Sequence, residues 1–266
     1  MSESNRSLSP SPHPAIVEQL GNGPDLVLCH GWAMHSGIWG RALELLAEDF
    51  RLHLVDLPGH GRHRDTPWPQ DWQQWNDQLG NAVPAGAIWA GWSLGGLFAL
   101  DQALRHNQRV AGVVLIASNP CFVSRDHWPA GVAEAVFEQF GNDLTADYRA
   151  GVDRFLALEV YGSDQARRAL RELRACAFAH GEPDSSALHH GLELLRQVDL
   201  TPRLAELTVP LLALGGSRDR LVPPAAIAAT AERAPQGIAR VIRGAGHAPF
   251  IGHRDEFVDC LREFGR

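Results

Sequence analysis

The sequence predicts an α/β protein with a mainly parallel central sheet that is covered by helices on both faces. Short, apolar, β-favouring runs alternate along the chain with segments of helix length. The runs are almost continuously apolar, which is typical of parallel strands buried on both faces. The expected strands are 25–29, 51–56, 87–90, 110–117, 209–214 and 239–242. Ligands bind beyond the carboxyl ends of such strands, so functional residues are expected in the loops that follow them.

Helices are expected between the early strands. Residues 38–50 have helical spacing, with apolar residues recurring on one face. Those residues are Ile38, Ala42, Leu45, Leu46 and Phe50. A second helix-like stretch, 96–105, directly follows the strand at 87–90. This order of strand, turn and helix recurs in parallel sheets.

The alternation stops between residues 119 and 190. Helical patterns, without a convincing strand, cover 132–140, 143–160, 163–178 and 186–198. A helical insertion between strands of a sheet typically covers the active site, so we expect a core of residues 15–118 and 191–266 with a helical lid at 119–190. The alternative is that these helices only pack on the core and have no role in binding. Residues 1–14 are rich in Ser and Pro and are expected to be a disordered tail.

Composition excludes several classes of function. The chain has 266 residues and a net charge of −7, which disfavours nucleic acid as a partner. It contains no apolar run near the roughly 18 residues of a membrane span, and its beginning lacks the apolar segment of a signal peptide. Its four cysteines are far apart, without the spacing of a zinc site or a disulfide framework. We therefore expect a cytoplasmic monomer without a metal or organic cofactor.

The pentapeptide Gly-Trp-Ser-Leu-Gly at residues 91–95 is the most informative motif. It stands between a predicted strand and a predicted helix, which is the context of a nucleophile elbow. Glycines flank the serine because the turn is too sharp for side chains there. Without this context the motif could equally be a glycine-rich turn with a surface serine. In this context Ser93 is predicted to be a nucleophile.

A serine nucleophile needs a histidine base and a carboxylate that orients the base. Asp219 follows the predicted strand 209–214, and His247 follows the strand 239–242 through Gly-Ala-Gly. Both the order Ser, Asp, His and the positions after strands agree with a hydrolase triad. His253 is the nearest competing histidine, but we expect it in or beside the last helix. We predict a catalytic triad of Ser93, Asp219 and His247.

Acyl transfer also requires backbone N–H groups that stabilise the oxyanion. The N–H of Leu94 follows the nucleophile at the start of a helix, whose dipole favours negative charge. The second donor is expected in the turn after an early strand, where His30-Gly31-Trp32 follows 25–29. Trp32 and Leu94 are therefore the predicted oxyanion hole, unless Trp32 only packs.

Together these motifs resemble the α/β-hydrolase superfamily. Further segments within and around the expected lid resemble the BioH-type pimeloyl-acyl-carrier-protein methyl ester carboxylesterases of biotin biosynthesis. The superfamily motifs are His30-Gly31-Trp32, the stretch 56–61 (D-L-P-G-H-G), 91–96 and 246–250 (G-H-A-P-F). The narrower resemblance rests on 117–122 (A-S-N-P-C-F), 125–129 (R-D-H-W-P), 154–158 (R-F-L-A-L) and 191–195 (G-L-E-L-L).

The resemblance implies an α/β-hydrolase fold, a serine carboxylesterase activity and an acyl carrier protein as the partner that bears the methyl ester. It also implies which residues contact the substrate: Trp32, Ser93, Leu94, Phe155, Leu156, Ala157, Leu158, Glu159 and His247. Glu159 departs from the family, which has a neutral polar residue there. A general short-chain esterase, a carbon–carbon bond hydrolase and a non-catalytic ligand receptor on the same fold remain alternatives.

An arginine-rich segment could bind the acidic carrier protein. Arg167, Arg171 and Arg174 are spaced i, i+4 and i+7, so they share one face of a predicted helix. Arg154 and Arg149 could extend this face. Electrostatic docking of an acidic partner is one reading of the pattern, with Arg154, Arg167 and Arg171 as the docking residues. The other is a solvated helix face paired with local acids.

Overall fold

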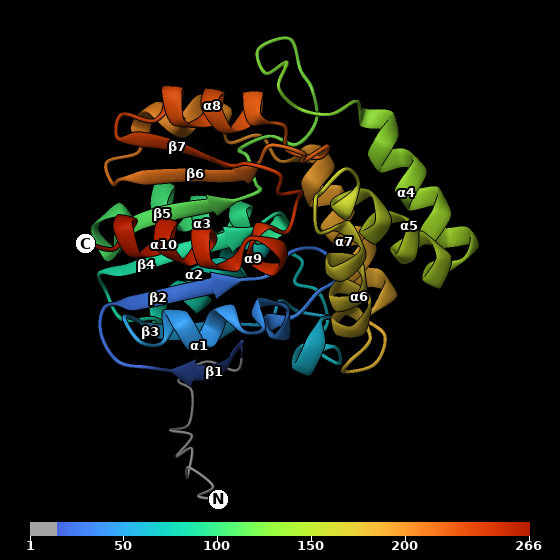
Figure 1. The fold of residues 1–266 in the computed structure, drawn as a ribbon, viewed down its shortest axis with the longest axis horizontal. Coiled ribbons are helices and arrows are strands. Elements are labelled where there is room, and N and C mark those ends of the chain that lie inside the picture. Colours follow the sequence, from blue (N-terminus) through green and yellow to red (C-terminus); the bar gives the residue numbers. More distant parts are fainter. Residues whose placement is uncertain (1–14) are drawn as a thin grey trace, which may run out of the picture.

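The computed structural model describes residues 15–266, so the expected tail at 1–14 lies outside the described residues. Its centre is a seven-stranded sheet with the strand order β1-β3-β2-β4-β5-β6-β7 (Figure 1). Neighbouring strands pair in parallel, except that β1 is antiparallel to β3. The predicted α/β class is confirmed. The strands are β1 (Ile16–Leu20), β2 (Asp25–Cys29), β3 (Arg51–Val55), β4 (Ala87–Trp92), β5 (Val110–Ile116), β6 (Leu211–Gly216) and β7 (Gly237–Ile242).

Burial of the strands follows their position in the sheet. Every residue of the inner strands β4 and β6 is buried, in agreement with their continuous apolar sequences. The last strand, β7, is at the edge of the sheet and exposes the four consecutive residues from Ile238 to Val241, whereas Gly237 at its start is half-buried. The sequence analysis did not predict β1, because a half-buried edge strand of five residues carries little periodic signal.

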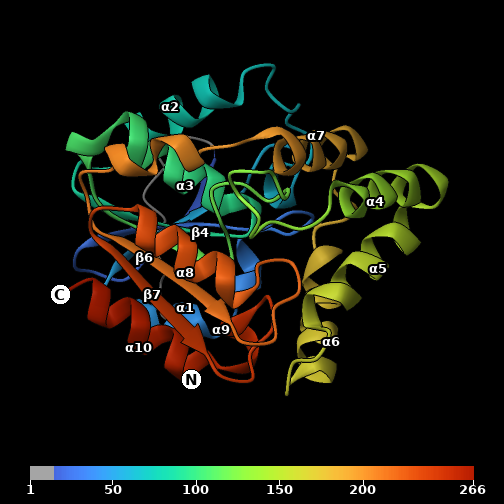
Figure 2. The same cartoon turned by 90° about the horizontal axis from the view of Figure 1, so that it is seen from above.

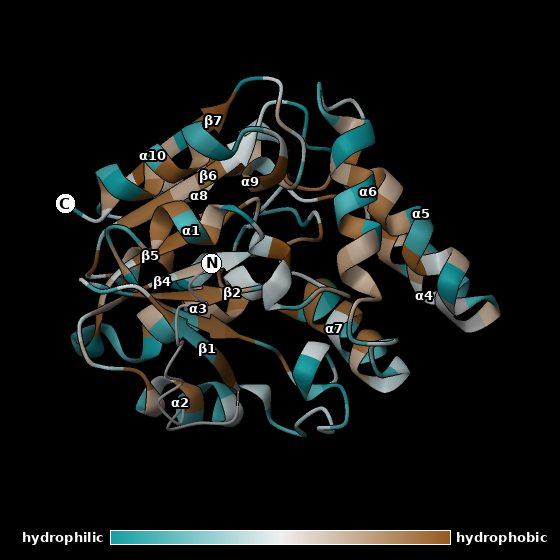
Figure 3. Ribbon diagram, turned by 60° about the horizontal axis from the view of Figure 1, so that its bottom comes forward, coloured by the Kyte–Doolittle hydropathy of each residue, from teal (hydrophilic) through white to brown (hydrophobic). Residues whose placement is uncertain are grey.

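Helices cover both faces of the sheet (Figure 2). One face carries α2 (Trp72–Ala82) and α3 (Leu94–Arg105), and the other carries α1 (Ala42–Leu46) and α10 (Arg254–Phe264). The short helix α9 (Pro249–Gly252) precedes α10, and α8 (Pro224–Arg233) packs on β6 and β7. In Figure 3 the inner strands are mainly hydrophobic, whereas hydrophilic stretches interrupt the outer helices.

The predicted helix at 38–50 is wrong in part. A 3₁₀ turn at Ser36–Trp39 and the short α1 replace it. Gly40 separates the two elements with a φ of 49°, a left-handed conformation that interrupts a right-handed helix. Apolar spacing continued across this glycine because both elements bury their apolar residues against the same core.

Four helices occur in the region expected to form the lid. They are α4 (Glu134–Ala146), α5 (Tyr148–Val160), α6 (Ala166–Ala177) and α7 (Ser185–Gln197). Figure 1 shows them grouped beyond the carboxyl ends of the parallel strands. Asp147 and Asp184 begin α5 and α7 by accepting hydrogen bonds from Ala150 N–H and Ala187 N–H. The boundary expected between residues 190 and 191 lies inside α7, so this helix would belong to both the expected lid and the expected core.

Within residues 15–266, no helix combines the length and the apolar character that a membrane crossing requires.

Candidate active site

Ser93 occupies the tight turn between β4 and α3. Its backbone lies in the left-handed region, with φ of 52° and ψ of −119°. A side chain at position 91 would collide with the carbonyl of Gly95, and one at position 95 would collide with the backbone at the end of β2. The two glycines therefore let the ends of β2 and β4 and the start of α3 approach closely. This packing holds Ser93 in its strained conformation.

Hydrogen bonds hold the turn from both sides. The N–H of Ser93 donates to the carbonyl of Ile116 on β5 at 3.0 Å. The hydroxyl of Ser118 donates to the carbonyl of Ser93 at 2.7 Å, and Gly96 N–H donates to the same carbonyl at 2.9 Å. The backbone of Ser93 is thus fully engaged, which leaves its side chain as the free polar group of the turn.

Asp219 and His247 lie on neighbouring loops and form a hydrogen-bonded pair. Asp219 follows β6 and His247 follows β7, and His247 Nδ1–H donates to Asp219 Oδ2 at 2.8 Å. The other carboxylate oxygen, Oδ1, accepts the N–H groups of Leu221 at 2.9 Å and Val222 at 3.0 Å. Asp219 therefore holds the histidine tautomer in which Nε2 is unprotonated and can act as a base.

The pair is buried, and burial and charge act in opposite directions on His247. Burial lowers the pKa of His247, but the charge of the Asp219 carboxylate and its hydrogen bond raise it, and the net shift is upward from 6.5. The raised pKa means that the site stabilises the imidazolium that forms when the histidine takes a proton. This electrostatic setting suits a general base.

The elbow and the histidine loop are connected through Trp92. Its Nε1–H donates to the carbonyl of His247 at 2.8 Å, and the two rings lie 5.8 Å apart. In the described part of the chain, His247 Nε2 has no hydrogen-bond partner, so it is not bonded to Ser93. Such catalytic hydrogen bonds often form only in the substrate complex.

The candidate oxyanion hole consists of two backbone N–H groups near this turn. The N–H groups of Trp32 and Leu94 have no acceptor within residues 15–266. Ala33, directly after Trp32, has a φ of 61°, so the loop after β2 turns sharply at this point. Two free donors at strained turns are what stabilisation of an oxyanion requires.

His30 supports this loop, a role that the sequence analysis did not assign. Its Nδ1–H donates to the carbonyl of Gly31 at 2.7 Å, and its Nε2 accepts the N–H of Leu57 at 2.9 Å. Burial, followed by the nearby His60, lowers the pKa of His30 to about 3. A neutral histidine therefore ties the loop after β2 to the loop after β3. The sequence signal was the histidine of the His-Gly-Trp motif.

The Trp32 side chain fastens the same loop to the lid. Its Nε1–H donates to the carbonyl of Leu188 on α7 at 2.9 Å. Its ring meets the edge of Phe155 on α5, with 4.7 Å between the ring centroids, and Phe155 in turn contacts Phe140 on α4. Trp32 therefore packs as well as offering its N–H.

The residues of the stretch 155–159, predicted to contact the substrate, differ in burial. Phe155, Leu156 and Glu159 are buried, and the carbonyl of Glu159 accepts the N–H of His247 at 3.0 Å. Leu158 is only half-buried. Ala157 is exposed, because it points from the opposite side of α5 to Phe155 and Glu159. The structure does not bring Ala157 to the other predicted substrate residues.

Most of the lid arginines are paired with acids from neighbouring segments. Arg154 pairs with Asp143 at 2.8 Å. Arg168 pairs with Glu172 on its own helix, and Arg174 pairs with Asp153 on α5. The sequence pattern missed Asp143 on α4 and Asp153 on α5, because each meets its arginine, on α5 and α6 respectively, only through helix packing. Arg167 and Arg171 are exposed and have no ion-pair partner within the described residues.

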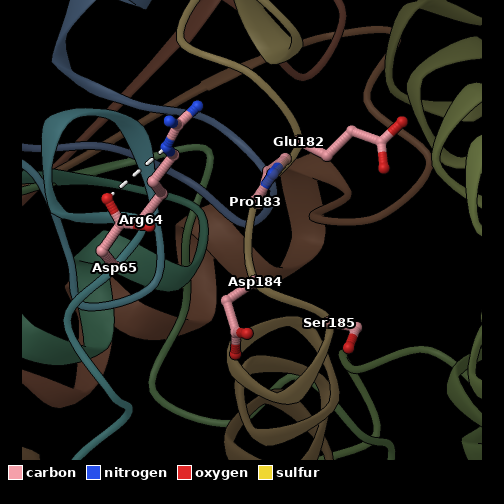
Figure 4. A pocket seen from close by; sticks show the side chains of 6 residues that line it. All are labelled: Arg64, Asp65, Glu182, Pro183, Asp184 and Ser185. Atoms are coloured by element: carbon pink, nitrogen blue, oxygen red, sulfur yellow. Dashed lines mark ion pairs between the residues drawn. The ribbon is translucent and has the colours of Figure 1, made fainter.

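A separate pocket of about 470 Å³ lies at the base of the lid (Figure 4). Arg64 and Asp65 on one side form an ion pair at 3.7 Å, and the segment 182–185 lines the other side. The Arg64 guanidinium also donates to the carbonyl of His180 at 2.6 Å. No triad residue lines this pocket. Arg64 pairs with Asp65 inside it, whereas Glu182 pairs with Arg149, which does not line the pocket. The triad itself is enclosed beneath the lid, since Ser93 is 2% exposed.

No group of three or more His, Cys, Asp or Glu side chains among residues 15–266 could hold a metal ion.

Comparisons with known proteins agree on the fold. A family model described as the alpha/beta hydrolase fold matches residues 24–254. An esterase from Exiguobacterium antarcticum superposes with a TM-score of 0.81 over 93% of both chains, at 21% sequence identity. At this identity the solved structure shows the fold alone.

Relatives with similar sequences indicate a narrower family than the fold does. A pimeloyl-acyl-carrier-protein methyl ester esterase of Xanthomonas campestris pv. campestris (strain B100) is 49% identical over 248 residues, which cover 93% of this chain and 97% of that protein. The protein of the same name from Stenotrophomonas maltophilia (strain R551-3) is 47% identical over 93% of this chain and 95% of its own length. The similarity therefore includes the lid as well as the sheet.

Proposed function

The chain belongs to the α/β-hydrolase family and, within it, to the pimeloyl-acyl-carrier-protein methyl ester esterases, and from this membership we propose that it hydrolyses the methyl ester of pimeloyl-acyl carrier protein in biotin biosynthesis. The products are pimeloyl-acyl carrier protein and methanol. The observation that carries the proposal is the identity of 49% across 93% of the chain to a relative with that name. Ester hydrolysis itself fits the Ser93 turn and the His247–Asp219 pair.

In the proposed acylation step, His247 Nε2 takes the Ser93 hydroxyl proton as the oxygen attacks the methyl ester carbonyl. The oxyanion that forms accepts hydrogen bonds from the N–H groups of Trp32 and Leu94. The imidazolium is stabilised by Asp219 across the 2.8 Å hydrogen bond. The carbon–oxygen bond to the methoxy group then breaks, and methanol leaves with the proton from His247.

In the proposed deacylation step, His247 removes a proton from water as the water attacks the acyl-enzyme carbonyl. The same two N–H groups hold the second oxyanion. Its collapse breaks the bond to Ser93 Oγ, which recovers the proton from His247. The free carboxylic acid end of the acyl chain is released.

The substrate carries two acyl bonds, the distal methyl ester and the thioester to the carrier. We propose that the lid admits only the distal end of the chain to Ser93, while the carrier stays outside. The enclosed triad and the packing of Phe155 on Trp32 support a narrow entrance.

The products of carrier-bound methyl pimelate test the proposed function. We expect the purified protein to release methanol and to leave pimelate attached to the carrier, because the thioester cannot reach Ser93. Mass spectrometry of the carrier and an assay for methanol would measure both products. Free pimelate as the main product would contradict the proposal, and so would a kcat/KM for the carrier-bound ester no greater than that for methyl butyrate.

Arg167 and Arg171 are the proposed docking residues for the acidic carrier, with Arg154 beside them. The first two are exposed and have no ion-pair partner among the described residues, whereas Arg154 is already paired with Asp143. Unpaired arginines can attract an acidic partner over long range without first breaking a local ion pair.

Charge reversal at these two positions is expected to slow only the carrier-bound reaction. For Arg167→Glu combined with Arg171→Glu, we expect kcat/KM with the carrier-bound ester to fall about tenfold or more at low salt, because steering changes association rates by this order. Methyl butyrate turnover should change less than about twofold. Raising the salt concentration should narrow the gap between the variant and the wild type.

The control reverses two exposed arginines outside the expected lid, Arg240 on the edge strand β7 and Arg51 at the start of β3, which pairs with Asp25 at 3.7 Å. This control changes the net charge by the same amount, so it should leave the carrier-bound reaction close to wild type. Equal losses in both double variants, or equal losses on both substrates, would contradict docking at α6.

We further propose that the protein acts as a monomer in the cytoplasm. All four cysteines are free, and burial raises the pKa of the Cys29 thiol to about 12, which suits an unreactive thiol in a reducing compartment. Sedimentation at micromolar concentration would measure the oligomeric state.

A further inference from the structure

The lid brings one ionisable side chain to the catalytic residues. Glu159 lies in the last turn of α5 and is 2% exposed. Its Oε2 atom is buried and has no hydrogen-bond partner among the described residues. Its own carbonyl accepts the N–H of His247 at 3.0 Å, so the backbone of this residue is fixed directly against the catalytic loop.

Two charged or titratable groups face Glu159: His247 on the loop after β7 and Asp219 on the loop after β6. Among residues 15–266, no arginine acts on this carboxyl group. Burial raises the pKa of Glu159 to about 8, with His247 opposing this shift and Asp219 adding to it. An unpaired carboxylate beside a second carboxylate is costly in such a site. Glu159 is therefore a neutral carboxylic acid at neutral pH.

The neutral acid and the ionised acid would have different effects on catalysis. The neutral form resembles an amide, since it has one hydrogen-bond donor and can accept at its carbonyl oxygen. The ionised form would stabilise His247 as the imidazolium before reaction and would repel the negative oxyanion. It would also attract water and so weaken the packing of α5 over the triad.

We propose that Glu159 positions His247 only while its side chain is the neutral carboxylic acid, and that the loss of this proton sets the alkaline limit of ester hydrolysis. The inference rests on the proposed function, because it assigns ester hydrolysis to Ser93 and His247.

The pH profile of the Glu159→Gln variant tests the inference, because glutamine keeps the shape and the donor but cannot ionise. The measurement is kcat/KM for methyl butyrate between pH 6 and 10 in a pH-stat. In the wild type, kcat/KM should fall above the Glu159 pKa of about 8 and be about tenfold lower one pH unit beyond it. Relative to its own value at pH 7, kcat/KM of the variant should show no fall up to pH 9.5.

Asp153→Asn is the matched control, since Asp153 is a partly exposed acid on the same helix that pairs with Arg174. It should keep the alkaline fall of the wild type. The same alkaline fall in Glu159→Gln would overturn the inference. Absence of turnover by the wild type at every pH would instead contradict the proposed function.

Thermal unfolding gives a second measurement that does not depend on turnover. The pKa of Glu159 in the folded protein is above its ordinary value of 4.5, so the folded state binds the proton more tightly than the unfolded state. The free energy of unfolding therefore decreases as pH rises from about 4.5 to about 8. The Tm of the wild type minus the Tm of Glu159→Gln should therefore decrease as the pH rises through this window. A difference in Tm that does not depend on pH would overturn the inference.

Discussion

Replacing Ser93 with alanine is expected to lower kcat for ester hydrolysis by about 10⁴- to 10⁶-fold, the range seen when a serine nucleophile is removed. This corresponds to about 5.5–8 kcal/mol of transition-state stabilisation. The loss is large because the acyl-enzyme cannot form, while the two oxyanion donors and the base remain in place. Single-turnover measurements with methyl butyrate and with the carrier-bound ester would determine it.

Ser93→Gly is the control that separates catalysis from folding. Alanine keeps the strain of a φ of 52°, whereas glycine adopts this conformation without a steric penalty. We expect both variants to be inactive, with the glycine variant about 1 kcal/mol more stable than the alanine variant. Activity above about 1% of wild type in either variant would show that Ser93 is not the nucleophile.

Replacing Asp219 with asparagine is expected to lower kcat by about 10³- to 10⁴-fold. Asparagine can still accept the N–H groups of Leu221 and Val222 through its Oδ1, so the loop should keep its shape. Its amide would donate to His247 Nδ1, where the carboxylate accepts. The histidine would then carry its proton on Nε2 and could not take the proton of Ser93. A kcat measured at pH 7.5, together with the Tm, would test this.

Asp199→Asn is the comparison for this variant. Asp199 accepts hydrogen bonds from Thr201 and His127 and has no contact with His247. Its kcat should stay within about twofold of wild type. If both asparagine variants lost activity to the same degree, a general loss of stability would explain the result better than a wrong tautomer at His247.

The motifs proposed to carry catalysis could be selected from sequence because each depends on local backbone geometry. The turn at Ser93 needs a strand, two small residues and a helix within a short stretch, and all of these are visible in sequence. Asp219 and His247 could be selected from their positions after strands, because parallel strands bring their carboxyl ends to one edge of the sheet. The comparisons confirm the family that these motifs resemble.

The lid was less predictable, although its four helices were expected. Periodicity predicts that α5 is a helix, but not that Glu159 faces His247 while Ala157 faces solvent. Similarly, the arginine spacing on α6 could not indicate that Asp153 neutralises Arg174. Both outcomes depend on how α5 packs against its neighbours.

The sequence by itself determined the α/β class and the helical segments between the strands, and it singled out the Ser, Asp and His residues proposed for catalysis, because turn geometry and residue type are encoded locally. Only the tertiary structure decided which lid arginines are unpaired and that a carboxylic acid lies buried beside the triad. Ion pairing and pKa depend on burial and on distances between atoms that are far apart in the sequence. Packing alone sets those distances.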